Sequence, residues 1–171
     1  MGAVIMNLGN CAKEGVLLAL KSMCNIVPKD IPKIEMQSVS QPRIYSNYES
    51  YVSLVVLKHE SVKGSGFIIL NLPKKNIKKI MDKAGLKDVT PHLITDFCGE
   101  FCSIIAGVFK TEIQKLGLGL IQIGLPLTYA EGVDQPIEDV HVEHKYLITI
   151  FDEDEQLLTL EVAFSSLKSA G

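Results

Sequence analysis

The sequence predicts an α+β domain in which helices pack against one mostly antiparallel sheet. Segments with helical apolar spacing alternate with segments of strand-like alternation, in the order helix, three strands, helix, then helix and three strands. This order looks like one unit used twice, so we expect an internal pseudo-twofold. The chain of 171 residues can bury one core, and no linker-like tract divides it. We therefore expect residues 1–171 to form a single domain.

The first half of the chain provides a helix and three strands. Apolar residues recur every three to four positions over 3–26, and Pro28 follows this helix. Residues 33–41 alternate apolar and polar side chains, which predicts a half-buried strand. Two longer strands, Tyr51–His59 and Gly66–Leu70, are expected to pair through a glycine-containing turn.

Two helices occupy the middle of the chain, and both have recognisable ends. Asn71 is a candidate N-cap for the first helix, and Gly85 follows its last apolar residue. Thr90 is the expected N-cap of the second helix, which carries apolar periodicity to Leu116 and stops at Gly117.

The last third of the chain predicts three further strands. Residues Leu118–Leu127 form an apolar run, which indicates a strand. A hairpin follows over 140–151 and 156–164, around the acidic turn 152–155.

Composition narrows the classes of partner. Seventeen basic and twenty acidic residues give a net charge of −3, which provides no basic field for nucleic acid or an anionic membrane. The apolar runs are too short to span a membrane and no signal sequence is visible, so we expect a cytoplasmic protein. The four cysteines lack metal-binding spacing and are expected to be reduced and mostly buried. A protein or small-molecule partner is favoured.

The long helix over residues 90–116 carries the sharpest pattern. At about 100° per residue, Asp96, Glu100, Ser103, Gly107 and Thr111 fall on one narrow face. The opposite face collects the apolar residues Ile94, Cys98, Phe101, Cys102, Ile105, Phe109, Ile113 and Leu116. The polar stripe is either an ordinary solvated face or a docking surface. Gly107 costs the helix about 1 kcal/mol relative to Ala, which favours a close approach by a neighbour at that point.

The same segment carries a family resemblance. Gly99–Gly107, preceded by Asp96 and followed by Lys110, resembles the signature helix of the CheX-like chemotaxis phosphatases, in the wider CheX, CheC and FliY group. The strand and proline-started helix of residues 60–85 and the strand of residues 119–126 are similar to the flanking units of that family. The resemblance covers about residues 45–165.

The resemblance implies a chemotaxis signalling protein that dephosphorylates a CheY-type response regulator. Family members use a Glu-x-x-Asn pair, in which the acid pairs with a lysine of the regulator and the amide holds the attacking water. Glu100 matches the acid, and Asp96, Gly107 and Lys110 would lie on the partner-binding stripe. The resemblance implies no cofactor in the chain itself, because the regulator brings its own Mg²⁺. It also implies a possible homodimer through sheet edges.

Ser103 departs from this pattern, because it stands where the family has the amide. A hydroxyl is shorter than an amide and lacks its paired donor and acceptor. Three outcomes stay open: a phosphatase of reduced activity, a serine that acts through a bridging water, or a binding or assembly module without catalysis. A further alternative places function on the lysine-rich helix face of residues 74–83, which is either a solvated surface or a site for an acidic partner.

Two weaker motifs also occur in the sequence. Asn7 and Asn10 echo the first motif of the CheC branch, with helix-surface asparagines as the ordinary interpretation. His141, Glu143 and His144 suggest a metal, but side chains alternate along a strand and cannot all converge on one ion. We therefore expect polar residues of an edge strand there, and no metal site.

Overall fold

The computed structural model describes residues 2–39, 49–60, 65–130 and 144–164, apart from the side chains of residues 2–7 and 144. Its helical elements are α1 (Gly2–Cys24), a short 3₁₀ turn η1 (Pro28–Asp30), α2 (Lys74–Lys83) and α3 (Pro91–Lys115). Its strands are β1 (Lys33–Ser38), β2 (Ser50–His59), β3 (Ser65–Pro73), β4 (Ile121–Ile123), β5 (Leu127–Tyr129), β6 (His144–Asp152) and β7 (Glu155–Phe164). The predicted α+β class is confirmed.

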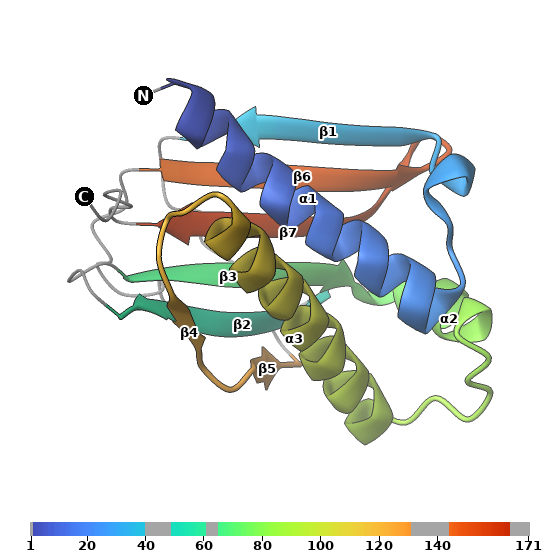
Figure 1. Cartoon of the computed structure of the whole chain (residues 1–171). Helices are drawn as coiled ribbons and strands as arrows, with labels where there is room; N and C mark the ends of the chain where they lie inside the picture. Colours follow the sequence, from blue (N-terminus) through green and yellow to red (C-terminus); the bar gives the residue numbers. More distant parts are fainter. Residues whose placement is uncertain (1, 40–48, 61–64, 131–143, 165–171) are drawn as a thin grey trace.

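All seven described strands join one sheet in the order β1-β6-β7-β3-β2-β4, with β5 also paired to β2. Every pairing among these strands is antiparallel. Helices α1 and α3 lie across one face of this sheet, and α2 sits at one end of it (Figure 1). The main apolar core fills the space between these helices and the sheet. A smaller buried cluster, which includes Val52, Phe67 and Ile69, lies on the other face.

The topology repeats in two halves, as expected. Hairpins β2–β3 and β6–β7 meet at the central β3–β7 pairing. In the first half, β1 follows α1 and pairs with β6 of the second half. In the second half, β4 and β5 follow α3 and pair with β2 of the first half. In each half, the strand segment that follows the long helix therefore pairs with the hairpin of the other half.

Helices α1 and α3 cross at close range. A Cβ atom on Gly15 would stand 2.9 Å from the carbonyl oxygen of Ile105, so glycine is required at this contact. The sequence pattern did not single out Gly15. By length and composition α3 could also span a membrane, but half of its most apolar stretch is buried in this core.

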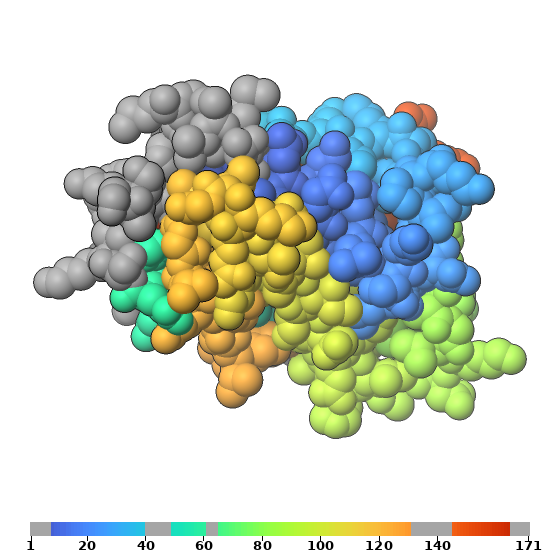
Figure 2. Space-filling view, viewed as in Figure 1, coloured from blue at the N-terminus to red at the C-terminus, as the bar shows by residue number. Residues whose placement is uncertain are grey.

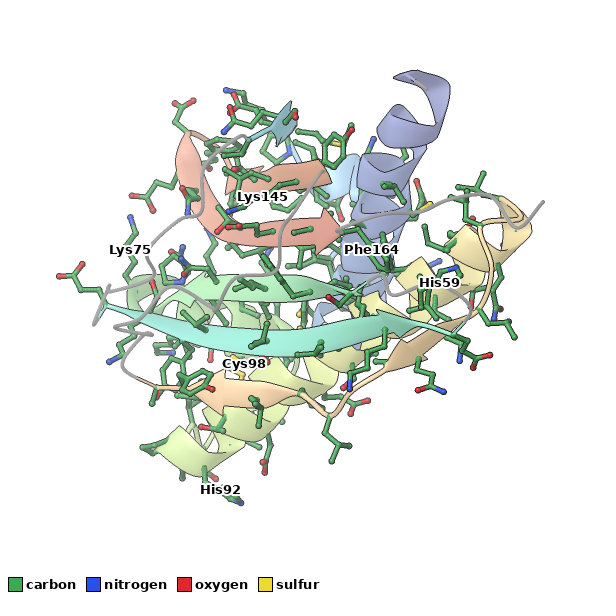
Figure 3. All side chains as sticks on the ribbon, turned by 90° about the vertical axis from the view of Figure 1, so that its left-hand side faces the viewer. His59, Lys75, His92, Cys98, Lys145 and Phe164 are labelled. Atoms are coloured by element: carbon green, nitrogen blue, oxygen red, sulfur yellow. The ribbon has the colours of Figure 1, made fainter. Side chains whose placement is uncertain are left out.

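All four cysteines are buried, free thiols, as expected. Burial raises the pKa of Cys98 and of Cys102 to about 12. Figure 3 shows Cys98 on the side of α3 that faces the sheet. These thiols are neutral core groups rather than nucleophiles.

The helix boundaries test the expected caps. Thr90 caps α3, because its side chain accepts a hydrogen bond from the Leu93 backbone N–H. Gly85 and Gly117 adopt the left-handed conformation after α2 and α3, with φ of 77° and 70°. The expected cap at Asn71 is wrong. Asn71 belongs to the central strand β3, which pairs on both sides and continues to Pro73.

Two segments near the start of the chain are shorter than predicted. Helix α1 ends at Cys24, where Asn25 turns left-handed with φ of 58°, two residues before the expected end. Strand β1 ends at Ser38 and is mostly exposed, not half-buried, because an edge strand has one neighbour only.

Near the other end of the chain, the hairpin strand predicted over 140–151 corresponds to β6, which begins in the described part of the chain at His144.

The strand predicted over Leu118–Leu127 is wrong in an informative way. It is two short strands, β4 and β5, with Gly124–Pro126 between them. Gly124 donates its N–H to the carbonyl of Val56, whereas Pro126 has no N–H and cannot donate a backbone hydrogen bond to β2. Leu57 pairs with Ile123 but Leu54 pairs with Leu127, so the edge holds one extra residue at this break.

Candidate functional site

Helix α3 buries the apolar face that its periodicity predicts. All the apolar residues expected on that face are buried except Leu116, which caps the C-terminal end and is 41% exposed. Because that face is fixed against the sheet, the polar stripe must point away from the core. Asp96 and Glu100 are exposed, and Ser103 is half-buried.

A groove of about 380 Å³ runs between α3 and the broken edge strand. Its lining consists of Thr95, Asp96, Gly99, Glu100, Ser103, Pro126 and Thr128. The structure thus brings together Asp96, Glu100 and Ser103, three of the residues that the sequence singled out. Figure 2 shows α3 (yellow to light green) at the molecular surface, with the segment that holds β4 and β5 (orange) beside it.

Gly107 and Lys110 do not line this groove; they lie further along α3, where both are half-buried. A Cβ atom on Gly107 would have nothing within 4 Å. The close approach expected at Gly107 is therefore not made by another segment of the described chain. A partner contact at Gly107 and Lys110 stays a prediction.

Acidic side chains give the groove a negative rim. Asp96 lies 3.4 Å from the Nε2 atom of His92, one turn earlier on α3, which is an ion pair only when the imidazole is protonated. His92 projects outward from the beginning of α3 (Figure 3). A cationic group of a partner could approach this rim from solvent.

Two lining residues, Thr95 and Thr128, were not singled out from the sequence, and two others, Gly99 and Pro126, stood only within the segments of the family resemblance. Pro126 carried a usable signal, because proline inside a predicted strand indicates an edge or a break. Thr128 carried none, because its partner is Ser53, far away in the sequence. Their hydroxyl oxygens lie 3.0 Å apart.

The lysine-rich face of α2 is largely paired within the chain. Lys79 bonds to Asp152, and this hydrogen bond raises the pKa of Lys79. Lys75 lies 3.8 Å from Glu155, and the acidic turn thus serves as a partner for the α2 lysines. Lys78 pairs with Asp82 on its own helix at 2.7 Å. This pairing leaves less charge for an external acidic partner than the sequence alone suggests.

The described residues contain no candidate metal site, because no three or more His, Cys, Asp or Glu residues among them are grouped so that they could bind an ion. His141 and Glu143 lie outside the described residues, as does the side chain of His144.

Comparisons with known structures identify the fold of the chain. No protein-family profile and no curated protein matches the sequence. A CheC-like superfamily protein from Shewanella sp. PV-4 superposes with a TM-score of 0.73 at 17% identity, over 94% of this chain and 98% of that one. The CheX–CheY–BeF3–Mg²⁺ complex from Borrelia burgdorferi gives 0.64 at 16% identity, over 92% and 97%. FliY from Thermotoga maritima gives 0.57 at 18% identity, over 96% and 90%. The chain has the CheX/CheC/FliY fold.

Within the CheX/CheC/FliY fold of this chain, α1 and α3 occupy related positions. The buried series Leu8, Ala12, Val16 and Leu20 on α1 has the same spacing as Phe101, Ile105, Phe109 and Ile113 on α3. Aligning the two series places Asn10 at the position of Ser103 and Asn7 at the position of Glu100. This agrees with the resemblance of Asn7 and Asn10 to the first motif of the CheC branch. Asn10 is exposed. It does not line the α3 groove.

Proposed function

We propose that this chain docks a phosphorylated CheY-type response regulator on α3 and accelerates hydrolysis of its aspartyl phosphate, with reduced activity. The observation that carries the proposal is that Glu100 and Ser103 share one open groove, on the helix that resembles the CheX signature. The same fold occurs in a CheX solved in complex with CheY, BeF3 and Mg²⁺, which supports a CheY-type partner.

The chemistry asks little of the protein beyond positioning. Phosphoryl transfer is catalysed mainly by alignment and charge stabilisation, so a group that holds a water in line with the phosphorus is sufficient. Glu100 would pair with a lysine of the regulator and fix the docking angle. Ser103, three residues later on the same helix face, would face the phosphate. Mg²⁺ would be supplied by the regulator.

The alternative is a regulator-binding or assembly module without catalysis. The short Ser103 side chain favours it, because a half-buried hydroxyl reaches less far into a partner than an amide does. Docking through Glu100 would survive in this alternative, and only the hydrolysis rate would differ.

The proposal includes the setting of the protein. Residues 1–171 would act as one CheX-like domain in the cytoplasm. A homodimer through a sheet edge is part of the proposal, supported by the exposed Leu127 and Tyr129 on the outer strand β5. Light scattering over a range of concentrations tests this: a monomer throughout contradicts the dimer.

The deciding experiment follows the decay of phosphate on CheY-type regulators with and without the protein, alongside a binding titration. Faster decay at saturating protein supports the phosphatase. Binding with unchanged decay supports the module without catalysis. Absence of binding to every regulator tested contradicts both.

A further inference from the structure

Thr128 places a second hydroxyl in the α3 groove, opposite Ser103. It pairs with Ser53 across the β2–β5 ladder, and the two hydroxyl oxygens lie 3.0 Å apart. Ser53 is fully buried, whereas Thr128 is half-buried and lines the groove. A buried side chain thus fixes an accessible hydroxyl.

The break in the edge strand is what brings Thr128 to this side of the sheet. If β5 continued the register of β4, Leu127 would face Ser53. The extra residue at Gly124–Pro126 instead turns Thr128 toward α3 and leaves Leu127 53% exposed. The neighbouring helix-facing residues of β2, Tyr51 and Val55, are apolar core residues. The hydrogen-bonded pair of Ser53 and Thr128 therefore interrupts an otherwise apolar row on β2, and core packing does not explain it.

The two hydroxyl-bearing residues line the same groove beside neighbouring turns of α3. The Oγ1 atom of Thr128 would stand 3.6 Å from a Cβ atom on Gly99, so it lies beside α3 at that residue. Ser103 follows Gly99 by four positions on the same helix face, so the Cβ positions of these two helix residues are about 5–6 Å apart. A water molecule seated in the groove between these neighbouring turns can hydrogen-bond to both hydroxyls.

The Ser53–Thr128 pair also keeps bonding capacity for the groove. A hydroxyl has one donor and two acceptor positions. If Ser53 donates to Thr128, the Thr128 proton is available to a water; if Thr128 donates, its second lone pair is available. In both arrangements Thr128 can hold a water.

We propose that Thr128 and Ser103 together hold the attacking water, in place of the single amide that the related motif uses. The inference rests on the proposed phosphatase function. The water oxygen bonds to phosphorus while the bond from phosphorus to the aspartyl oxygen breaks. The products are the free carboxylate and inorganic phosphate, and the water proton passes to the phosphate.

The test compares matched threonine variants in the regulator-phosphate assay. Thr128→Val removes the hydroxyl at nearly constant shape, and we expect kcat to fall about five- to tenfold with KM for the phosphorylated regulator unchanged. Thr128→Ser keeps the hydroxyl and should restore the rate. Thr149→Val, a buried strand position outside the groove, is the control and should leave the rate unchanged.

A second background separates this inference from the proposed function. In Ser103→Asn protein the amide holds the water alone, so Thr128→Val should change kcat by less than about twofold there. A wild-type rate in Thr128→Val, or an equal loss in both backgrounds, overturns the role of Thr128 and leaves the phosphatase intact. If the wild-type protein binds regulator without accelerating decay, the role of Thr128 fails while docking stands.

Discussion

Helices α1 and α3 lie across the same face of the sheet, but they differ in what lies beside them: α3 borders a groove at the broken edge strand, whereas α1 packs closely against β1. On α1, a Cβ atom on Gly9 would meet the Met36 sulfur of β1 at 2.5 Å and a ring carbon of Tyr146 on β6 at 3.2 Å. On α3, a Cβ atom on Gly99 would meet Pro126 and Thr128 only at 3.6 Å. The interrupted edge strand thus leaves accessible space beside α3 at Gly99.

The largest expected effect is a gain of activity on the α3 side. Ser103→Asn adds the amide to a groove with room for it, and the dephosphorylation rate should rise by about 10²- to 10³-fold. Asn10→Ala, at the related position of α1, should leave the rate unchanged. The decay of regulator phosphate measures both. If Asn10→Ala changed the dephosphorylation rate as much as Ser103→Asn does, the functional difference between α1 and α3 would be contradicted.

The next effect concerns the crossing of the two helices. Gly15→Ala places a Cβ atom 2.9 Å from a backbone oxygen of α3, so the helices must separate. We expect a loss of about 1–3 kcal/mol in the free energy of unfolding, measured by urea denaturation. Unchanged stability would mean that the crossing is looser than the contact indicates.

A smaller effect is expected on docking. Glu100→Ala removes the acid at the groove, and the Kd for a CheY-type regulator should rise about tenfold. Glu153→Ala removes an equal charge from the β6–β7 turn and serves as the control in the same titration. If the two variants bind equally well, Glu100 has no part in docking.

The smallest effect is expected at Gly107, on the polar stripe of α3. Gly107 has open space around it, so Gly107→Ala should stabilise the free protein by up to about 1 kcal/mol, in contrast to Gly15→Ala. Thermal unfolding measures this gain. If a partner covers Gly107, the same variant should bind the regulator more weakly.

Local patterns predicted the helices better than the edge of the sheet. The apolar spacing of α3 and its Thr90 cap depend on residues a few positions apart, so the sequence displays them directly. The groove depends on a register shift against β2, and its Thr128 contacts Ser53, 75 positions away. The failed cap at Asn71 also reflects strand pairing, since the pairing of β3 with β2 continues past Asn71 to Pro73. Glu100 and Ser103 were predictable because one helix carries both.

The exchange of first strands between the halves ties their folding together. A cut in the connection between α2 and α3 would leave β1 without β6, and β4 and β5 without β2. Neither fragment keeps a complete half-sheet, so each should stay unfolded alone and recover structure only when the other is present. The two fragments would then report their own association, which makes this connection a natural place to split the protein for complementation.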